Sequence, residues 1–284
     1  MPVKLNLVEA KSILVKSGLP ASDWVINAYN GCMFGCMYCY AASMARWKHP
    51  HDEWGSYLDV KKNAPELLHV ELGKLFNRFK AKNFGSIFLS SVTDPYVGFE
   101  AKYRLTRRCL EVLADFEYEG KISIQTKSPL VIRDLDVLKR LKNVTVGFTV
   151  TTLDDKVSQF LEVSAPKSSE RIKALQKLHD NGVSTYAFIG PILPYFTAIE
   201  HKIEELLDKL QEVGVLEVWF EHINLNGFIK SRLYEYLQQE DSQLIPYFDR
   251  TLDQTYRDEL DQIIHRCMKG RSLKMSCNKV LFHK

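Results

Sequence analysis

Short runs of β-branched and aromatic residues alternate along the chain with stretches of helical periodicity. Apolar residues recur at three- and four-residue spacing, with charges between them, over Ala64–Lys80, Lys102–Phe116, Pro129–Leu141, Ser168–Asn181 and Ala198–Val213. These stretches predict helices. The intervening apolar runs predict six strands, at Asp23–Ala28, Ser86–Ser90, Ile122–Lys127, Val144–Val150, Ser184–Gly190 and Leu216–His222.

Strand and helix in repeated alternation require crossover connections and therefore a mainly parallel sheet. The order favours an α/β fold with an open or partial (β/α)6 barrel, and a doubly wound open sheet is the alternative. We expect the barrel core with its N-terminal lead-in to occupy residues 1–226. After Asn226 the pattern becomes helical and charged, so residues 227–284 are expected to form a helical C-terminal extension packed on the core. In either architecture ligands bind at the carboxyl ends of the strands.

Three of the six cysteines, Cys32, Cys36 and Cys39, stand at C-x3-C-x2-C spacing after the first predicted strand. Three thiolates on one compact loop can each bind a corner iron of a [4Fe-4S] cluster, which leaves the fourth iron open to a methionine-derived ligand. Gly31 and Gly35 allow the backbone to turn tightly there. This spacing is the strongest chemical signal in the sequence.

The other cysteines and nearby histidines leave alternatives open. A Cys3His zinc site would take His49 or His51 as its fourth ligand. Cys109 lies on the apolar stripe of a predicted helix and is expected in the core. Cys267 and Cys277, near His265 and His283, are candidates for a second metal or auxiliary cluster.

At its cysteine loop the chain resembles the radical S-adenosylmethionine (SAM) superfamily, and within it the spore photoproduct lyase-like group. The resemblance covers most of residues 22–225. It rests on the motif from Asn27 to Tyr40, Trp54-Gly55, Thr93-Asp94-Pro95-Tyr96, Leu105-Thr106-Arg107-Arg108, Thr126-Lys127-Ser128-Pro129 and the stretch Leu161–Arg171.

The resemblance implies a six-stranded partial barrel and an enzyme with two cofactors, a [4Fe-4S] cluster and SAM. A reduced cluster would cleave SAM to methionine and a 5′-deoxyadenosyl radical, which removes hydrogen from a substrate. A reducing electron donor such as flavodoxin or ferredoxin is the implied partner. Candidate cofactor-binding residues are Tyr38 and Tyr40, near adenine, and Thr93, Lys127 and Thr149, at positions that contact SAM.

Lys127 also fits this role on chemical grounds, because an ammonium at the end of the third predicted strand can pair with the carboxylate of SAM. Glu162 and Arg171 are expected either to orient SAM or to pair with each other. Further polar candidates at strand ends are Asp94, Glu100, Glu221, His222 and Asn224. The aromatic residues Trp47, Trp54 and Tyr57 are expected to shield the loop or to pack in the core.

Ser91 marks a departure from the group. Spore photoproduct lyases carry a hydrogen-donating cysteine just before the T-x-D-like segment, and a serine O–H bond is too strong to return hydrogen readily. Direct repair of the thymine photoproduct is therefore not expected, and a small molecule or peptide is the favoured substrate. Nucleic-acid repair or modification is the alternative, since basic residues occur at Lys102, Arg104, Arg107, Arg108 and in the tail from Lys269 to Lys284. A zinc-binding structural module is the remote alternative.

Charge and hydropathy narrow the list of partners. The formal net charge of +3 is too small to indicate nucleic acid by itself. No apolar run approaches the ~18 residues of a membrane-spanning helix, and residues 1–20 interleave Lys and Glu among apolar residues, unlike an export signal. We therefore expect a cytoplasmic protein with no membrane partner.

Overall fold

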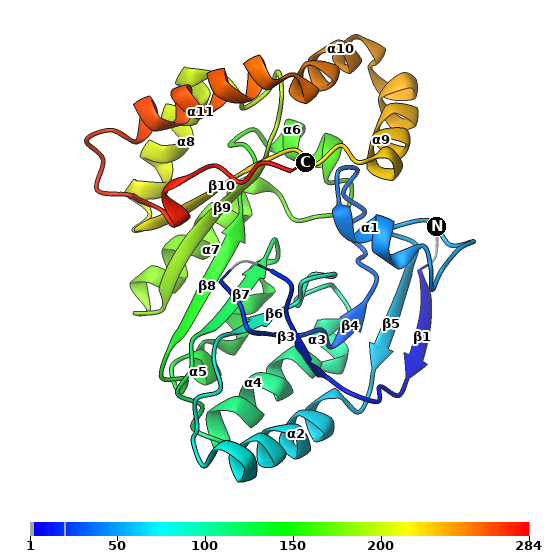
Figure 1. The fold of residues 1–284 in the computed structure, drawn as a ribbon, viewed down its shortest axis with the longest axis vertical. Coiled ribbons are helices and arrows are strands. Elements are labelled where there is room, and N and C mark those ends of the chain that lie inside the picture. The colour runs from blue at the N-terminus through cyan, green and yellow to red at the C-terminus, as the bar shows by residue number, and fades with distance from the viewer. Residues whose placement is uncertain (1–2, 20, 284) are drawn as a thin grey trace.

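A computed structural model describes residues 3–19 and 21–283 of the chain. Within these residues a sheet of eight strands forms the core, in the order β11-β10-β9-β8-β7-β6-β3-β2 (Figure 1). The parallel strands at its centre are β3 (Trp24–Ile26), β6 (Ile87–Leu89), β7 (Ile122–Thr126), β8 (Val144–Thr149), β9 (Ser184–Ile192) and β10 (Glu217–His222). They match the six predicted strands and follow one another in chain order. The fold is therefore an open, singly wound barrel, and the doubly wound alternative is wrong.

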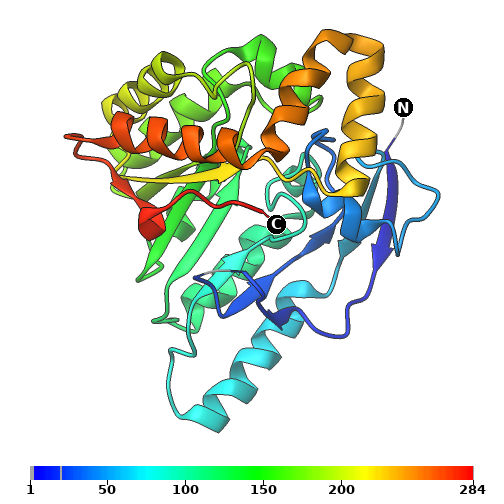
Figure 2. The same cartoon turned by 45° about the horizontal axis from the view of Figure 1, so that its top comes forward.

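Helices connect the strands and cover the outside of the sheet (Figures 1 and 2). Three predicted helices are confirmed, as α2 (Ala64–Phe79), α7 (Ser168–Asp180) and α8 (Glu200–Glu212). Two short helices were not predicted, because each is too brief to show a period: α1 (Tyr40–Ala45) and α6 (Asp155–Leu161).

The predicted helix over 102–116 is interrupted at Arg104, which has a left-handed φ of +52°. The break separates α3 (Glu100–Tyr103) from α4 (Leu105–Asp115). The buried Glu100 carboxylate accepts the amide N–H groups of Thr106 and Arg107, at 3.0 and 3.2 Å, and so caps α4 across the break. The predicted helix over 129–141 is likewise divided, into the 3₁₀ helix η1 (Pro129–Asp134) and α5 (Leu135–Leu138).

A second, three-stranded sheet lies beside the barrel at the N-terminal end of the chain (Figure 1). Its strands are β1 (Lys4–Val8), β5 (Tyr57–Lys61) and β4 (Tyr29–Asn30), and the edge strand β2 (Leu14–Lys16) pairs antiparallel with β3 of the barrel. These strands were not predicted, because they are short and β1 and β2 are partly solvent-exposed. β4 leads directly into the cysteine loop.

The segment after residue 226 begins as predicted, with helices, and then returns to the sheet. Its elements are α9 (Gly227–Glu240), η2 (Ser242–Leu244), α10 (Ile245–Asp249), η3 (Arg250–Leu252), α11 (Gln254–Met268), β11 (Lys274–Met275) and η4 (Ser276–Asn278). β11 pairs parallel with β10, so the tail adds to the barrel sheet (Figure 2). The domain boundary at residues 226/227 stays a prediction. In the described part of the chain, no helix combines the length and apolar character needed to cross a membrane.

Candidate functional site

The cysteine loop runs from the end of β4 to the start of α1, at the carboxyl end of the barrel strands. Cys32 and Cys36 are buried, Cys39 is partly buried, and all three are free thiols. Gly31 has φ +86°, and a Cβ atom there would lie 2.7 Å from the Tyr57 carbonyl oxygen. Gly35 has φ +62°. Both glycines thus have a left-handed backbone, and at Gly31 a side chain would also collide with Tyr57.

Burial raises the pKa of all three thiols, and that of Cys36 reaches about 12 although the Lys127 ammonium acts in the opposite direction. Burial disfavours the charged thiolate, which is the form that binds metals. A thiolate in this loop is therefore stable only beside a strongly positive partner. The residues present fit that requirement for an iron–sulfur cluster, because soft sulfur ligands and neighbouring cations are both at hand.

A buried polar network supports the loop from the side of α6 and α7. The Tyr38 hydroxyl donates to Glu162 Oε1, the Arg171 guanidinium donates to Glu162 Oε2, and Thr151 Oγ1 donates to Oε1 at 3.0 Å. Glu162 and Arg171 are fully buried. Burial alone would raise the pKa of Glu162, but Arg171 and Lys127 hold it below its ordinary value. Of the two predicted roles for Glu162 and Arg171, the geometry shows mutual pairing.

Lys127 differs from these two residues because its ammonium has no hydrogen bond or ion pair within the described residues. The side chain follows β7, and Nζ lies 5.7 Å from the centroid of the Tyr38 ring. Burial would lower the pKa of Lys127, yet the neighbouring Cys36 and Glu162 raise it. The structure therefore brings this cation near Cys36 and Tyr38, and the predicted contact of Lys127 with SAM stays a prediction.

The other predicted cofactor-binding residues lie around the same loop. The Thr93 hydroxyl donates to the Gly31 carbonyl, and the partly exposed Tyr40 donates its hydroxyl to the Ser91 carbonyl. Thr149 accepts a hydrogen bond from Gln125 Nε2 at 3.2 Å, and its carbonyl accepts one from Arg171 Nη1 at 3.1 Å. Thr93 and Tyr40 thus tie the loop to the segment after β6, and Thr149 ends β8, two strands further along the sheet.

Arg232 on α9 is a residue at this site that sequence reasoning missed. Its guanidinium donates to the carbonyl oxygens of Gly35, Cys36 and Met37, at 3.0, 2.9 and 2.9 Å. A single arginine on an amphipathic helix carries no signal of such a contact, because the separation in sequence is 196 residues from Cys36.

The zinc alternative does not find its fourth ligand in His49. Both ring nitrogens of His49 are engaged, Nδ1 with Asp52 and Nε2 with Asp59, each at 2.9 Å. His51 is exposed. A tetrahedral zinc site needs ligand atoms within ~4 Å of one another, and in the described ranges the cysteine loop supplies no group of three ligand atoms converging within 4.8 Å.

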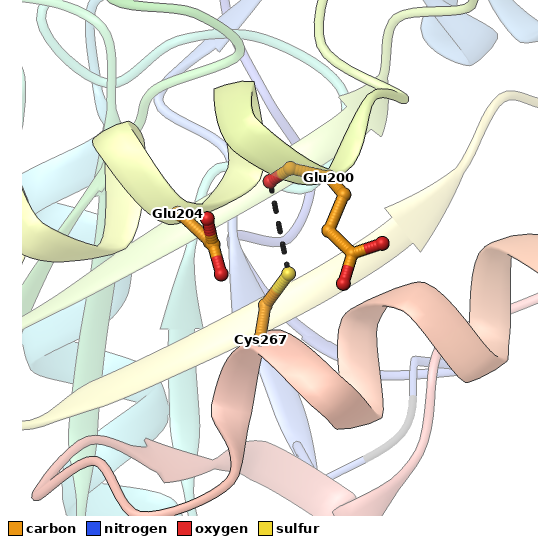
Figure 3. A group of neighbouring side chains, drawn as sticks. All are labelled: Glu200, Glu204 and Cys267. Atoms are coloured by element: carbon orange, nitrogen blue, oxygen red, sulfur yellow. Dashed lines mark hydrogen bonds between the residues drawn. The ribbon is translucent and has the colours of Figure 1, made fainter.

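The group that does converge this closely is Glu200, Glu204 and Cys267 (Figure 3). Cys267 Sγ is already directed at the Glu200 carbonyl oxygen, 3.7 Å away, and the Glu200 carboxylate pairs with Arg266 at 2.9 Å. Cys277 is exposed and not part of the group. The geometry therefore gives the predicted Cys267/Cys277 site no support.

Two of the further polar candidates are occupied by the fold itself. Asp94 accepts from Thr126 Oγ1 at 2.6 Å and from the amides of Tyr96 and Lys127, at 2.8 and 2.7 Å. Glu100 caps α4, as described above. Both residues satisfy buried backbone groups, which leaves neither free for a ligand.

The candidates at the end of β10 point in different directions. Glu221 pairs with His283 of the tail at 2.9 Å. His222 is buried beside Tyr256, and burial, with Arg257 nearby, lowers its pKa to about 4. The Asn224 side chain accepts from the Asn226 amide at 3.2 Å. Of these residues, Glu221 acts on the loop, because its charge, after burial and Cys39, contributes to the raised pKa of Tyr40.

The predicted aromatic and basic residues also differ from one another in what they contact. Trp54 packs edge-on against Tyr57 near the loop, whereas Trp47 is 79% exposed and shields nothing. Arg107 pairs with Asp134 and Asp136, and Arg108 pairs with Glu66. These two arginines are therefore neutralised; Lys284, the last residue of the predicted basic tail, lies outside the described residues.

Comparisons with known proteins agree on one family. The family model described as the Radical SAM superfamily matches residues 26–210. An uncharacterised protein of Methanocaldococcus jannaschii is 34% identical over 203 residues, which are 72% of this chain and 73% of that protein. An uncharacterised protein of Acidianus two-tailed virus is 28% identical over 250 residues, 82% of this chain and 78% of that one.

Among solved structures, a spore photoproduct lyase complexed with dinucleoside spore photoproduct matches 98% of this chain and 82% of its own, with a TM-score of 0.73 and 16% identity. A variant of spore photoproduct lyase with bound AdoMet and dinucleoside spore photoproduct matches 98% of this chain and 81% of its own, with a TM-score of 0.72 and 17% identity. At these identities the likeness establishes the fold.

Proposed function

Because this chain belongs to the radical SAM superfamily and is therefore an enzyme, we propose that Cys32, Cys36 and Cys39 hold a [4Fe-4S] cluster. When bound, the cluster would supply the electron that cleaves SAM to a 5′-deoxyadenosyl radical, which takes hydrogen from a substrate. The observation that carries this proposal is the loop itself: two buried thiols and one partly buried thiol lie on a loop with two left-handed glycines, and the Lys127 ammonium, which has no ion pair in the described residues, acts on Cys36.

The chain's own residues bind and orient SAM in this proposal. Lys127 pairs with the SAM carboxylate, since its Nζ has no other partner in the described structure and a charge-assisted hydrogen bond is the strongest contact open to it. Tyr38 packs near the adenine, with its ring held in place by Glu162. Tyr40, Thr93 and Thr149 complete the contacts. Glu162 and Arg171 act through Tyr38 and the loop rather than on SAM, because their polar atoms are already hydrogen-bonded.

The proposed compartment and electron donor follow from the chemistry of a reduced iron–sulfur cluster. All six cysteines lack disulfides, and a low-potential cluster needs a reducing compartment, so we place the enzyme in the cytoplasm. A small redox protein such as flavodoxin or ferredoxin supplies the electron. The barrel residues exclude solvent from the radical, which would otherwise be quenched.

The decisive experiment is anaerobic reconstitution with iron and sulfide, followed by addition of SAM and dithionite. Wild type is expected to bind about four irons and four sulfides and to form 5′-deoxyadenosine. The triple variant Cys32→Ala/Cys36→Ala/Cys39→Ala should do neither. Cys277→Ala, which removes an exposed cysteine outside the loop, is the matched control and should behave as wild type. Zinc without sulfide, and no SAM cleavage by wild type, would overturn the proposal.

We favour a small molecule or peptide as substrate, because Ser91 stands where photoproduct lyases of this group are expected to carry a donor thiol. The alternative, action on nucleic acid, is favoured by the fold likeness to spore photoproduct lyase. The two are separated by binding of single- and double-stranded oligonucleotides at low and high salt. Salt-sensitive binding supports the nucleic-acid reading, and none at low salt argues against it.

A further inference from the structure

Arg232 holds three successive carbonyl groups of the cysteine loop with one side chain. Nη1 donates to the oxygens of Cys36 and Met37, and Nη2 donates to that of Gly35. The planar guanidinium presents these donors in a fixed fork, which an ammonium cannot reproduce. α9 therefore fixes the shape of the loop and also contacts α6, where the Tyr236 hydroxyl donates to the Phe160 carbonyl at 2.7 Å; α9 packs beside α1 in both views (Figures 1 and 2).

Burial lowers the pKa of Arg232 while Cys39, Cys36 and Glu53 act in the opposite direction, but none of the described acids forms an ion pair with it. In the part of the chain that the structure describes, no carboxylate oxygen lies within the 4.0 Å of an ion pair, and the three carbonyl dipoles are its only recorded hydrogen-bond partners. A partly buried cation without a counter-charge is unfavourable unless an anion comes close. Three thiolates make a cluster assembly anionic, and reduction adds one more negative charge.

We propose that Arg232 is a positioning residue that fixes the cysteine loop and raises the reduction potential of the cluster held there. A fixed positive charge near the cluster stabilises the reduced form more than the oxidised form, because the reduced form carries the larger negative charge. This inference rests on the proposed function. It adds that the C-terminal extension, through α9, makes the cluster easier to reduce.

The test compares three reconstituted proteins by electron paramagnetic resonance at a series of fixed potentials. Arg232→Met removes the charge and the fork, and should lower the ratio of reduced to oxidised cluster about tenfold, which is ~59 mV for a one-electron couple. Arg232→Lys keeps the charge and should stay within about threefold of wild type. Arg46→Met, the control, removes an exposed arginine after α1 and should stay within about twofold, because solvent screens that charge.

Failure of this inference and failure of the proposed function are distinguishable. No iron and sulfide in wild type would refute the proposed function. Full clusters in all variants, with the same ratio in Arg232→Met as in wild type, would refute the inference alone.

If Arg232→Met retains no cluster, alkylation of the loop thiols in the apoproteins takes the place of the titration. Circular dichroism first establishes that the variant is folded. Loop cysteines should then react more than about fivefold faster in Arg232→Met than in Arg46→Met, because the hydrogen bonds from Arg232 to the loop carbonyl groups are lost. Equal rates would overturn the inference.

Discussion

Two kinds of charged group surround the cysteine loop: a buried ion pair, and two cations that form no ion pair within the described residues. Glu162 and Arg171 bind each other at zero exposure and hold Tyr38. Lys127 and Arg232 approach the same loop with no carboxylate within ion-pair distance in the described structure, although Glu162 is near enough to raise the pKa of Lys127. Paired buried charge stabilises the fold, and unpaired charge beside thiols indicates that an anionic ligand belongs there. The comparison separates scaffold from site among residues that looked alike in sequence.

The largest expected effect is on the Glu162–Arg171 ion pair. Glu162→Ala leaves the Arg171 guanidinium buried without its counter-charge, which should lower the free energy of unfolding of the apoprotein by about 3–5 kcal/mol in urea titrations. The double variant Glu162→Leu/Arg171→Met should recover much of this loss, because apolar residues of similar volume replace both charges. A loss below about 1 kcal/mol in Glu162→Ala would contradict the scaffold role.

Lys127→Met should have the opposite effect: it should weaken SAM binding and leave the stability of the fold almost unchanged. Loss of a charge-assisted hydrogen bond, worth about 1.5–3 kcal/mol, should weaken SAM binding about 10- to 100-fold in equilibrium dialysis with reconstituted protein. The free energy of unfolding should change by less than about 1 kcal/mol, since no protein group loses a partner. Lys48→Met, at an exposed position after α1, is the control. Unchanged SAM affinity together with lost stability would reverse the assignment of Lys127.

The smallest effect concerns His49, between Asp52 and Asp59 behind the loop. Burial alone would lower the pKa of His49, but its hydrogen bonds to Asp59 and Asp52 raise it above the ordinary value. Protonated His49 therefore stabilises the fold fully below pH ~6.5, and this contribution is lost as the pH rises through the raised pKa.

Comparison of wild type with His49→Gln separates the pH-dependent stabilisation by His49 from the titration of the other histidines. The stability difference between wild type and variant should shrink between pH 6 and pH 8.5, by less than about 1 kcal/mol because the pair is close to solvent. Urea titrations at both pH values measure it. A difference that grows with pH would show that neutral His49 is the favoured form.

The six barrel strands could be predicted because each is a buried, β-branched run between helical periods. Ile122 and Ile124, for example, are fully buried and alternate with less buried neighbours. β1, β2 and the break at Arg104 escaped prediction for a physical reason. Short, partly exposed strands carry little hydrophobic signal, and the left-handed Arg104 is stabilised by Glu100 capping α4, a tertiary contact that no local pattern reports.

The site, like the fold, could be predicted only where its residues carry a local sequence signal. The spacing of Cys32, Cys36 and Cys39 and the place of Lys127 after a buried strand are local signals, and both residue sets meet in the fold. The role of Arg232 depends on how α9 packs against α1, far along the chain from the loop. Whether Glu162 faces a ligand or Arg171 depends on side-chain direction, which the sequence left open.

The return of the tail to the sheet has a consequence for how the molecule behaves among its own copies. Without β11, the outer side of β10 would present free backbone groups, ready to pair with a strand of another chain. The tail uses them: Lys274 and Leu281 donate their amides to Leu216 and Phe220, and the His222 amide donates to Leu281. The tail thereby covers the outer edge of β10 and prevents it from pairing with strands of other chains, which would lead to aggregation.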